Sequence, residues 1–398
     1  MIPAVNVTLV NGQIGGSIGT NDNTCGMVLT GAGTGTLPLL APIKVVSVVD
    51  AISQGVTLAV EPEAYKFVNE FYSIPGTFGV GLYLMLAADT TTLVSLCDGT
   101  VSTGVKKLAD FAQGAIRVMG VSRTPGVGYT PPTAKFLDSD VFAAIPNAQI
   151  LAQAAFNAHT PYRILIAARI NDVANVTIDT PNTQTDNKVG LVLGSSLPDG
   201  LTSMGIILGR VAATAPQVNI GRVADGALPV TSWFLGDLPI LPDLSNPTAP
   251  WYEQISQLIN SGFITVTNYP QVAGLFISDD PMAVAASDDY CSLANGRVID
   301  KASIVTYKTY TQNINDDVDL DSNNLLAPVV VAALEDEITN ALNLNMAASM
   351  SGDAIVYIDP SQPIVSTSLL NITLRVQPKG YLKIIDVNLG FNNPLNTN

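Results

Sequence analysis

The stretch that decides the fold begins at residues 251–262 with the sequence WYEQISQLINSG. Apolar residues recur in it at the three- and four-residue spacing of an amphipathic helix. Gly262 closes the segment, and glycine is the usual residue where a helix ends in a left-handed turn. The segment therefore predicts a helix that stops just before Gly262.

Two strands and a second helix are predicted directly after this glycine. The runs FITVT at 263–267 and GLFIS at 274–278 are short and rich in β-branched and aromatic residues, which is typical of strands. Ser287 or Asp288 then offers an N-cap for a longer helix. The apolar face of that helix is predicted to carry Ile304, Tyr307, Thr311 and Ile314.

The order of these elements resembles the C-terminal domain of contractile tail sheath proteins. That family forms the sheaths of contractile bacteriophage tails, R-type pyocins and related contractile injection systems. The motifs that carry the resemblance are Asn-Ser-Gly-Phe-Ile at 260–264, Asn-Tyr-Pro at 268–270 and Ser-Asp-Asp-Pro at 278–281. The family usually has an Arg-Thr pair after the second strand, where this chain has Ile277-Ser278.

Composition excludes several classes of protein. Of 398 residues, 47% are hydrophobic and 13% charged, which is enough apolar material for two or three folded units and argues against disorder. The net charge of −15 argues against binding a nucleic acid backbone, which needs clustered Lys and Arg. Because no apolar run is long enough for a bilayer and no signal peptide is visible, we expect a soluble protein without membrane contact. Three widely spaced cysteines indicate neither a disulfide framework nor a metal site.

Before residue 250, apolar strands alternate with helices, which is typical of an α/β unit with a mostly parallel sheet. Strands are predicted at 26–30, 43–49, 79–87, 114–121, 162–169, 189–193, 217–223 and 230–235. Helices are predicted at 62–73, 103–113, 139–156 and 200–209. A Pro-rich segment at 238–250 indicates a domain boundary.

Strand-forming sequence lies at both ends of the chain. The C-terminal part has an acidic loop, a helix from Pro328, strands at 354–359 and 370–377, and a last strand at 381–389. A Gly-rich segment follows the N-terminal strand and gives it freedom to sit away from its own domain. Unpaired strand edges recruit other chains, so the two ends predict pairing between subunits. The arm residues are predicted to be Val5, Val7, Leu9, Tyr381, Lys383, Ile385, Val387 and Leu389.

Four sequence patterns resemble catalytic or ligand-binding motifs but lack features that those motifs require. Ser17 lies in a G-x-S-x-G string, but no helix follows it, as a nucleophile elbow requires. His159 is the only histidine, and the Gly-rich turn 31–35 lacks the spacing of a phosphate-binding loop. The acidic residues 317–321 lack the glycine and glutamate of a calcium loop, although a weak structural ion there stays open. No catalytic residue, cofactor or metal is predicted, and we expect the protein not to be an enzyme.

The resemblance implies a structural sheath subunit of mixed α/β (α+β) fold. It implies a discontinuous, tube-proximal core domain built from residues 1–35 and 250–398, with an inserted, outward-facing α/β domain at 36–249 and extended β-arms at both termini. The implied partners are other copies in hexameric rings, an inner tail tube protein, and baseplate and tail terminator proteins. The implied location is a virion tail or injection particle assembled in the bacterial cytoplasm.

Three cations are predicted to lie on one face of the helix after residue 288. Arg297, Lys301 and Lys308 are spaced by four and seven residues, so they share a helix face that is either solvated or turned towards an acidic tube.

Two other functions stay open as alternatives. The first is an α/β hydrolase or nucleotide-binding enzyme, which would place Ser17 or Gly31 in a cleft. Another virion structural protein, such as a tube or capsid component, is the second alternative.

Overall fold

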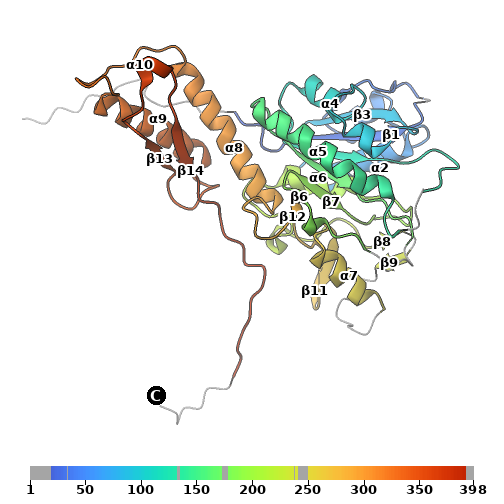
Figure 1. Cartoon of the computed structure of the whole chain (residues 1–398). Helices are drawn as coiled ribbons and strands as arrows, with labels where there is room; N and C mark the ends of the chain where they lie inside the picture. The colour runs from blue at the N-terminus through green and yellow to red at the C-terminus, as the bar shows by residue number, and fades with distance from the viewer. Residues whose placement is uncertain are drawn as a thin grey trace, which may run out of the picture.

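The computed structural model describes residues 19–33, 35–131, 135–172, 178–236, 238–240 and 250–390, with only the backbone described at 238–240 and 250–254. The larger part is an α/β unit around a six-stranded sheet. The smaller part contains two helices and a two-stranded sheet, and one long helix, α8, leads into it from the larger part (Figure 1). Within the described ranges, no helix combines the length and the apolar character needed to cross a lipid bilayer.

The six-stranded sheet has the order β2-β3-β1-β4-β5-β7. β1 (Cys25–Gly31) pairs in parallel with a strand on each side, so that Val28 lies opposite both Met85 and Val121. Edge strand β2 runs antiparallel to β3, and the remaining pairs are parallel. The other bounds are Ile43–Val45 (β2), Leu82–Ala88 (β3), Val118–Ser122 (β4), Arg163–Ala167 (β5) and Val189–Val192 (β7). The inner strands are buried along most of their length, and the predicted α/β class with a mostly parallel sheet is confirmed.

Helices cover both faces of this sheet. Crossovers that run in opposite directions along a parallel sheet place their helices on opposite faces, because both are right-handed. Accordingly α2 and α6 pack together on one face, and α4 and α5 lie on the other. The bounds are Val48–Ser53 (α1), Pro62–Ser73 (α2), Leu93–Leu96 (α3), Val105–Ala112 (α4), Ser139–Asn157 (α5) and Met204–Ala213 (α6).

Short two-stranded ribbons follow the sheet. β6 (Thr185–Asp186) pairs with β12 (Ala283–Val284), β8 (Trp233–Leu235) with β9 (Leu238–Ile240), and β10 (Val266–Tyr269) with β11 (Val272–Ile277). Helix α7 (Pro250–Asn260) precedes the β10–β11 hairpin, and Gly262 has a φ of 94°, which confirms the predicted left-handed turn. Short 3-10 helices lie at Pro181–Thr183, Val223–Asp225 and Thr311–Asn313.

Helix α8 (Leu293–Tyr310) belongs to both hydrophobic cores. Leu293 lies in the core of the α/β unit, whereas Val298, Ala302 and Val305 pack into a second core with α9. That smaller unit consists of α9 (Pro328–Met346), β13 (Ile355–Ile358), α10 (Ile364–Thr367) and β14 (Ile372–Arg375). The helix therefore connects the two units mechanically.

Several predicted elements differ from the structure. The strand predicted at 43–49 ends at Val45, because the hydroxyl of Ser47 accepts the N–H of Asp50 and caps α1. The strand predicted at 217–223 is a loop that ends in a 3-10 helix. The N-cap of helix α8 is Ser292, and not the predicted Ser287 or Asp288, so the helix starts at Leu293. The last predicted strand, 381–389, has no strand partner within the described chain.

The pairing of β1 also bears on the predicted domains. The predicted core domain combines residues 1–35 with residues 250–398. In the structure, residues 25–31 form an inner strand of the sheet of the α/β unit. The run CGMVLTG is apolar enough to be buried on both faces, which only an inner position allows. The inner and outer placement of the two domains in a particle stays a prediction.

Candidate functional site

The segment after β14 is an extended chain with an exposed row of apolar side chains. Leu389 is 94% exposed and Leu382 is 87% exposed, and the same holds to a lesser degree for Ile384, Ile385 and Val387. Figure 1 shows this segment running away from both units towards the C-terminus. Exposed apolar side chains in this number are typical of surfaces that associate with a partner.

Two of the predicted arm residues hold the beginning of this segment to the body. The hydroxyl of Tyr381 donates to the carbonyl of Gln217 at 2.9 Å, and Nζ of Lys383 donates to Asp279 at 2.5 Å. Ile385, Val387 and Leu389, which follow, are exposed. Val5, Val7 and Leu9 lie outside the described residues.

The two-stranded sheet offers a surface of the matching kind. β13 and β14 pair with each other from Ile355↔Arg375 to Ile358↔Ile372, and among the described strands neither has another neighbour. Val356 and Leu374 pack inwards, while Ile355 and Tyr357 are 67% and 57% exposed. The free edges of the two strands carry unpaired backbone N–H and C=O groups, so they are suited to further strands.

A groove of about 420 Å³ runs between α8 and β14. Its lining is mainly apolar and aromatic, and includes Ile299, Leu374 and Val376. The ring of His159 stacks on Tyr307 with 3.9 Å between centroids. His159 thus contributes a packed wall at the end of α5, and Ser17, with which it would have to act, lies outside the described residues.

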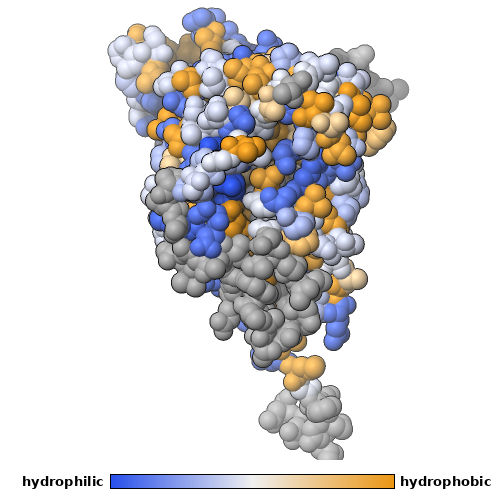
Figure 2. All heavy atoms as spheres, turned by 90° about the vertical axis from the view of Figure 1, so that its right-hand side faces the viewer, coloured by the Kyte–Doolittle hydropathy of each residue, from blue (hydrophilic) through white to orange (hydrophobic). Residues whose placement is uncertain are grey.

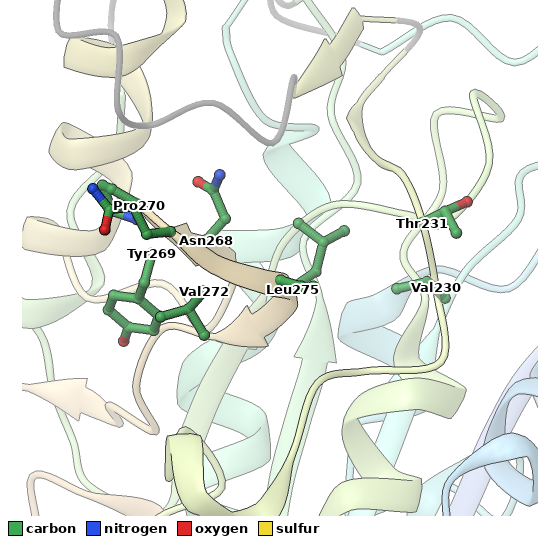
Figure 3. A pocket seen from close by; sticks show the side chains of 10 residues that line it. Val230, Thr231, Asn268, Tyr269, Pro270, Val272 and Leu275 are labelled. Atoms are coloured by element: carbon green, nitrogen blue, oxygen red, sulfur yellow. The ribbon is translucent and has the colours of Figure 1, made fainter.

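A second cavity, of about 590 Å³, lies beside the tip of the β10–β11 hairpin. Figure 3 shows Leu275 and Val230 on its two sides, with Tyr269 and Val272 next to each other on the hairpin. Tyr269 and Val272 are 37% and 46% exposed. Its described lining residues include no carboxylate, histidine, lysine or arginine.

The three cations predicted to face a tube lie together on α8, but they contact this chain's own N-terminal segment. Nζ of Lys301 donates to the Asp22 carboxylate at 2.7 Å, and Nζ of Lys308 donates to the carbonyl of Gly19 at 2.6 Å. Arg297 is only 4% exposed and donates to the carbonyls of Asp22 and Thr214. Because its side chain is buried within this chain, Arg297 offers little surface to a tube protein. A contact of the three cations with a tube stays a prediction.

A buried ion pair lies beside these contacts. Arg163, on β5, donates to both carboxylate oxygens of Asp300, on α8, at 2.9 and 3.1 Å. The same guanidinium donates to the carbonyls of Gly296 and Asn187. A Cβ at Gly296 would lie 2.2 Å from the guanidinium carbon, so glycine is what lets the helix approach the arginine. The pair was not anticipated, because its partners are 137 residues apart in the sequence.

Asp280 is a fully buried carboxyl next to the root of the C-terminal segment. It accepts the backbone N–H of Ala294 and the side-chain amide of Asn219, each at 2.8 Å. The pKa of Asp280 is raised to about 8, mainly by burial and then by the neighbouring Asp279, against the smaller opposing effects of that N–H, Lys383 and Arg297. Desolvation dominates because the carboxyl has no exposed surface.

This shift predicts how stability depends on pH. Between the ordinary carboxyl value of 3.8 and about 8, the folded chain holds a proton on Asp280 that the unfolded chain has released. The contribution of Asp280 to the free energy of unfolding therefore decreases as pH rises through this range, by at most about 1.4 kcal/mol per pH unit. Urea denaturation of the wild type and of Asp280→Asn between about pH 6 and about pH 9 measures it. Parallel pH profiles for the two proteins would contradict the assignment.

The other sequence patterns have structural roles. The N–H of Gly33, after β1, donates to the side-chain carboxyl group of the buried Glu61 at 2.8 Å, so a side chain of this chain already accepts an N–H that a phosphate-binding turn would offer to its ligand. In the acidic loop, Asp321 accepts the backbone N–H groups of Asn323 and Leu325, and these bonds lower the pKa of its carboxyl. Across the described ranges, no group of three potential metal-binding side chains is found.

A Ser-Lys-Glu cluster beyond β7 was missed by sequence reasoning. Lys66 donates to Ser195 at 2.8 Å, and Ser203 donates to Glu70 at 2.6 Å. Lys66 also pairs with Asp199, and burial raises the pKa of Glu70. Since the hydroxyl of a nucleophile must be accessible and Ser195 is 1% exposed, we interpret the cluster as internal hydrogen bonding. No local motif signals it, because Lys66 and Ser195 are 129 residues apart.

Further apolar side chains are exposed on the α/β unit near edge strand β2, among them Val49 at 76% and Phe78 at 96%. Figure 2 views the side of the molecule at the right of Figure 1, and it shows hydrophobic residues gathered over the upper part of that side. Exposed apolar patches of this kind are typical of proteins that associate.

Comparisons with known proteins agree over the whole chain. Residues 2–281 match the family model described as DUF2586, N-terminal domain, and residues 289–396 match DUF2586, C-terminal domain. The boundary between them falls just before α8. No match was found among curated proteins.

Three solved structures share the fold over nearly the full length of both chains. A chain of the anti-feeding prophage baseplate has a TM-score of 0.62 at 12% identity, covering 99% of each chain. A chain of the anti-feeding prophage helical sheath in the contracted state has 0.62 at 14% identity, covering 98% of this chain and 99% of that one. A chain of the contracted sheath complex of PVC, an extracellular contractile injection system, has 0.60 at 9% identity, covering 98% of each. The protein therefore belongs to the DUF2586 family, and its fold is that of contractile sheath proteins.

Proposed function

We propose that this protein is a structural subunit of a contractile sheath, stacked as rings around an inner tube and contracting to drive the tube through a target envelope. The observation that carries the proposal is the agreement of the fold with sheath chains over 98% of this chain, small unit and C-terminal segment included. A match confined to the α/β unit would suit many functions, because layered α/β folds host many.

The two ends of the chain supply the connections between subunits in this proposal. Residues 384–389 of one copy add to a sheet of a neighbour, and their backbone groups gain partners while their apolar side chains are covered. Complete burial of a single Leu or Ile contributes about 1.5–3 kcal/mol, so several such side chains make a substantial contact. Residues 1–12 are proposed to act in the same way at the other end.

The receiving surface that fits best is the β13–β14 sheet with the groove beside it. The sheet has free edges in the described chain, and the groove along β14 is lined by apolar side chains. An added strand would place alternate side chains in the groove and the others towards solvent. This pairing keeps neighbours connected while their bodies move relative to one another.

The remaining partners follow from the same proposal. An inner tube protein, a baseplate and a tail terminator would contact the sheath at its inner surface and at its ends. The small unit with residues 250–292 would lie towards the tube, and the α/β unit, including β1, would face outwards. The subunits would be made in the bacterial cytoplasm, and the tail or injection particle is where they would function.

Electron microscopy of the purified full-length protein tests the proposal. We expect tubes with a helical repeat, either spontaneously or after the protein is concentrated, because the assembling surfaces belong to the chain itself. Light scattering on the same sample measures the mass of the assemblies. A monodisperse monomer under all these conditions would overturn the proposal.

A further inference from the structure

The beginnings of both terminal arms are attached to one loop of the α/β unit. This loop, residues 214–219, leaves the end of α6 and passes the start of α8. Residues 19–22, called the N-terminal root here, reach it through Arg297. Residues 381–383, the C-terminal root, reach it through Tyr381.

The N-terminal root is held by charge. Lys301 pairs with the Asp22 carboxylate at 2.7 Å, and the side chains of both residues are mostly buried. Nη2 of Arg297 donates to two carbonyls, that of Asp22 at 3.1 Å and that of Thr214 at 3.0 Å. One nitrogen atom thus joins the N-terminal root to the 214–219 loop.

The C-terminal root is held at the same loop, three residues further on. The carbonyl of Gln217 accepts the hydroxyl of Tyr381, and its side-chain oxygen accepts the hydroxyl of Ser349 at 3.0 Å. Asn219 donates to both Asp279 and Asp280, and Asp279 pairs with Lys383. Displacement of this loop would therefore loosen the C-terminal root.

Arg297 is a buried charge whose hydrogen bonding is incomplete. Its Nε and Nη1 have no hydrogen-bond partner in the described structure, although the side chain is buried. A cavity of about 10 Å³ lined by Arg297, Arg117, Lys301, Asp22 and Asp300 lies beside it, with room for about one water molecule. The cations there outnumber the carboxylates, so Asp22 is needed to balance the charge. A displaced N-terminal root would leave buried positive charge uncompensated.

We propose that Arg297 and the 214–219 loop form a latch that couples the two arm roots, so that release of one root loosens the other. The inference rests on the proposed function for its meaning, because the roots determine where the arms leave the subunit. The coupling itself is a property of a single chain. In a sheath, tension on one arm would be transmitted to the other through the latch.

Spin labels on unassembled full-length subunits test the coupling. Position 23 and position 382 are exposed, so Asn23→Cys places a label directly after the N-terminal root and Leu382→Cys places one within the C-terminal root. Cys291→Ser removes the half-buried cysteine, and Cys25 and Cys97 stay unreactive because burial raises the pKa of both thiols to about 12. Arg297→Met is expected to abolish the immobile spectral component at both positions. The matched control, Lys106→Met on the exposed face of α4, leaves both spectra unchanged.

A second variant keeps the test decisive if Arg297→Met does not fold. Asp279→Ala removes the partner of Lys383 and one contact of Asn219, and we expect it to mobilise the label at position 23 as well as that at position 382. If only position 382 responds, the roots are independent and the latch is refuted. Because the spectra are taken on unassembled subunits, a failure of the wild type to form tubes would overturn the sheath proposal and not the latch.

Discussion

Deletion of residues 381–398 is expected to leave a folded subunit that no longer forms tubes. The exposed side chains from Leu382 to Leu389 contribute little to either hydrophobic core, so the deletion costs mainly the bonds of Tyr381 and Lys383 to the body and should leave both cores folded. Assembly, in contrast, loses the apolar strand that a neighbour would cover. Circular dichroism reports the fold, and electron microscopy with light scattering reports the assembly.

Point variants separate the role of this segment from an effect of shortening the chain. Ile385→Ser with Val387→Ser retains the length but removes two exposed apolar side chains, and it should weaken polymerisation strongly. Ile150→Ser, at a 68% exposed isoleucine of α5, is the matched control for the loss of a surface apolar group. Normal tubes from the truncated chain would refute the connecting role of the C-terminal arm. The same loss of assembly is predicted for deletion of residues 1–12.

Asp300→Ala is expected to give the largest loss of stability from a single substitution discussed here, about 3–5 kcal/mol. The substitution leaves the guanidinium of Arg163, which is 1% exposed at its side chain, buried without its counter-charge. Because this pair joins β5 to α8, the junction between the two units should loosen first. Urea denaturation measures the loss. A change in the slope of the free energy of unfolding against urea concentration would report that the two units unfold separately.

Two further variants identify the cause of this loss. Asp336→Ala removes an exposed carboxylate from α9 and should change the free energy of unfolding by no more than about 0.5 kcal/mol. Arg163→Met with Asp300→Leu removes both charges and should recover part of the loss, since an apolar pair carries no desolvation penalty. If Asp300→Ala were as stable as Asp336→Ala, the pair would not hold the two units together.

Local patterns were enough to predict most elements of the fold. The helix predicted at 62–73 has the same bounds as α2, and the one predicted at 139–156 differs from α5 by one residue. Hydrophobic periodicity and capping residues act over a few residues, so they can be read along the chain. The same reasoning failed at 43–49 and 217–223, where a cap and a loop interrupt apolar sequence that resembles a strand.

By itself the sequence determined the α/β class, the order of elements around residues 251–314, and the apolar character of the C-terminal segment. Only the tertiary structure decided what the charged side chains of α8 contact. Lys301 and Lys308 look like a solvated face from their spacing, yet they bind Asp22 and Gly19, which lie 279 and 289 positions earlier. The placement of β1 inside the sheet and the pairing of Arg163 with Asp300 were decided in the same way. Burial and charge compensation depend on which distant segments meet, and no local pattern carries that information.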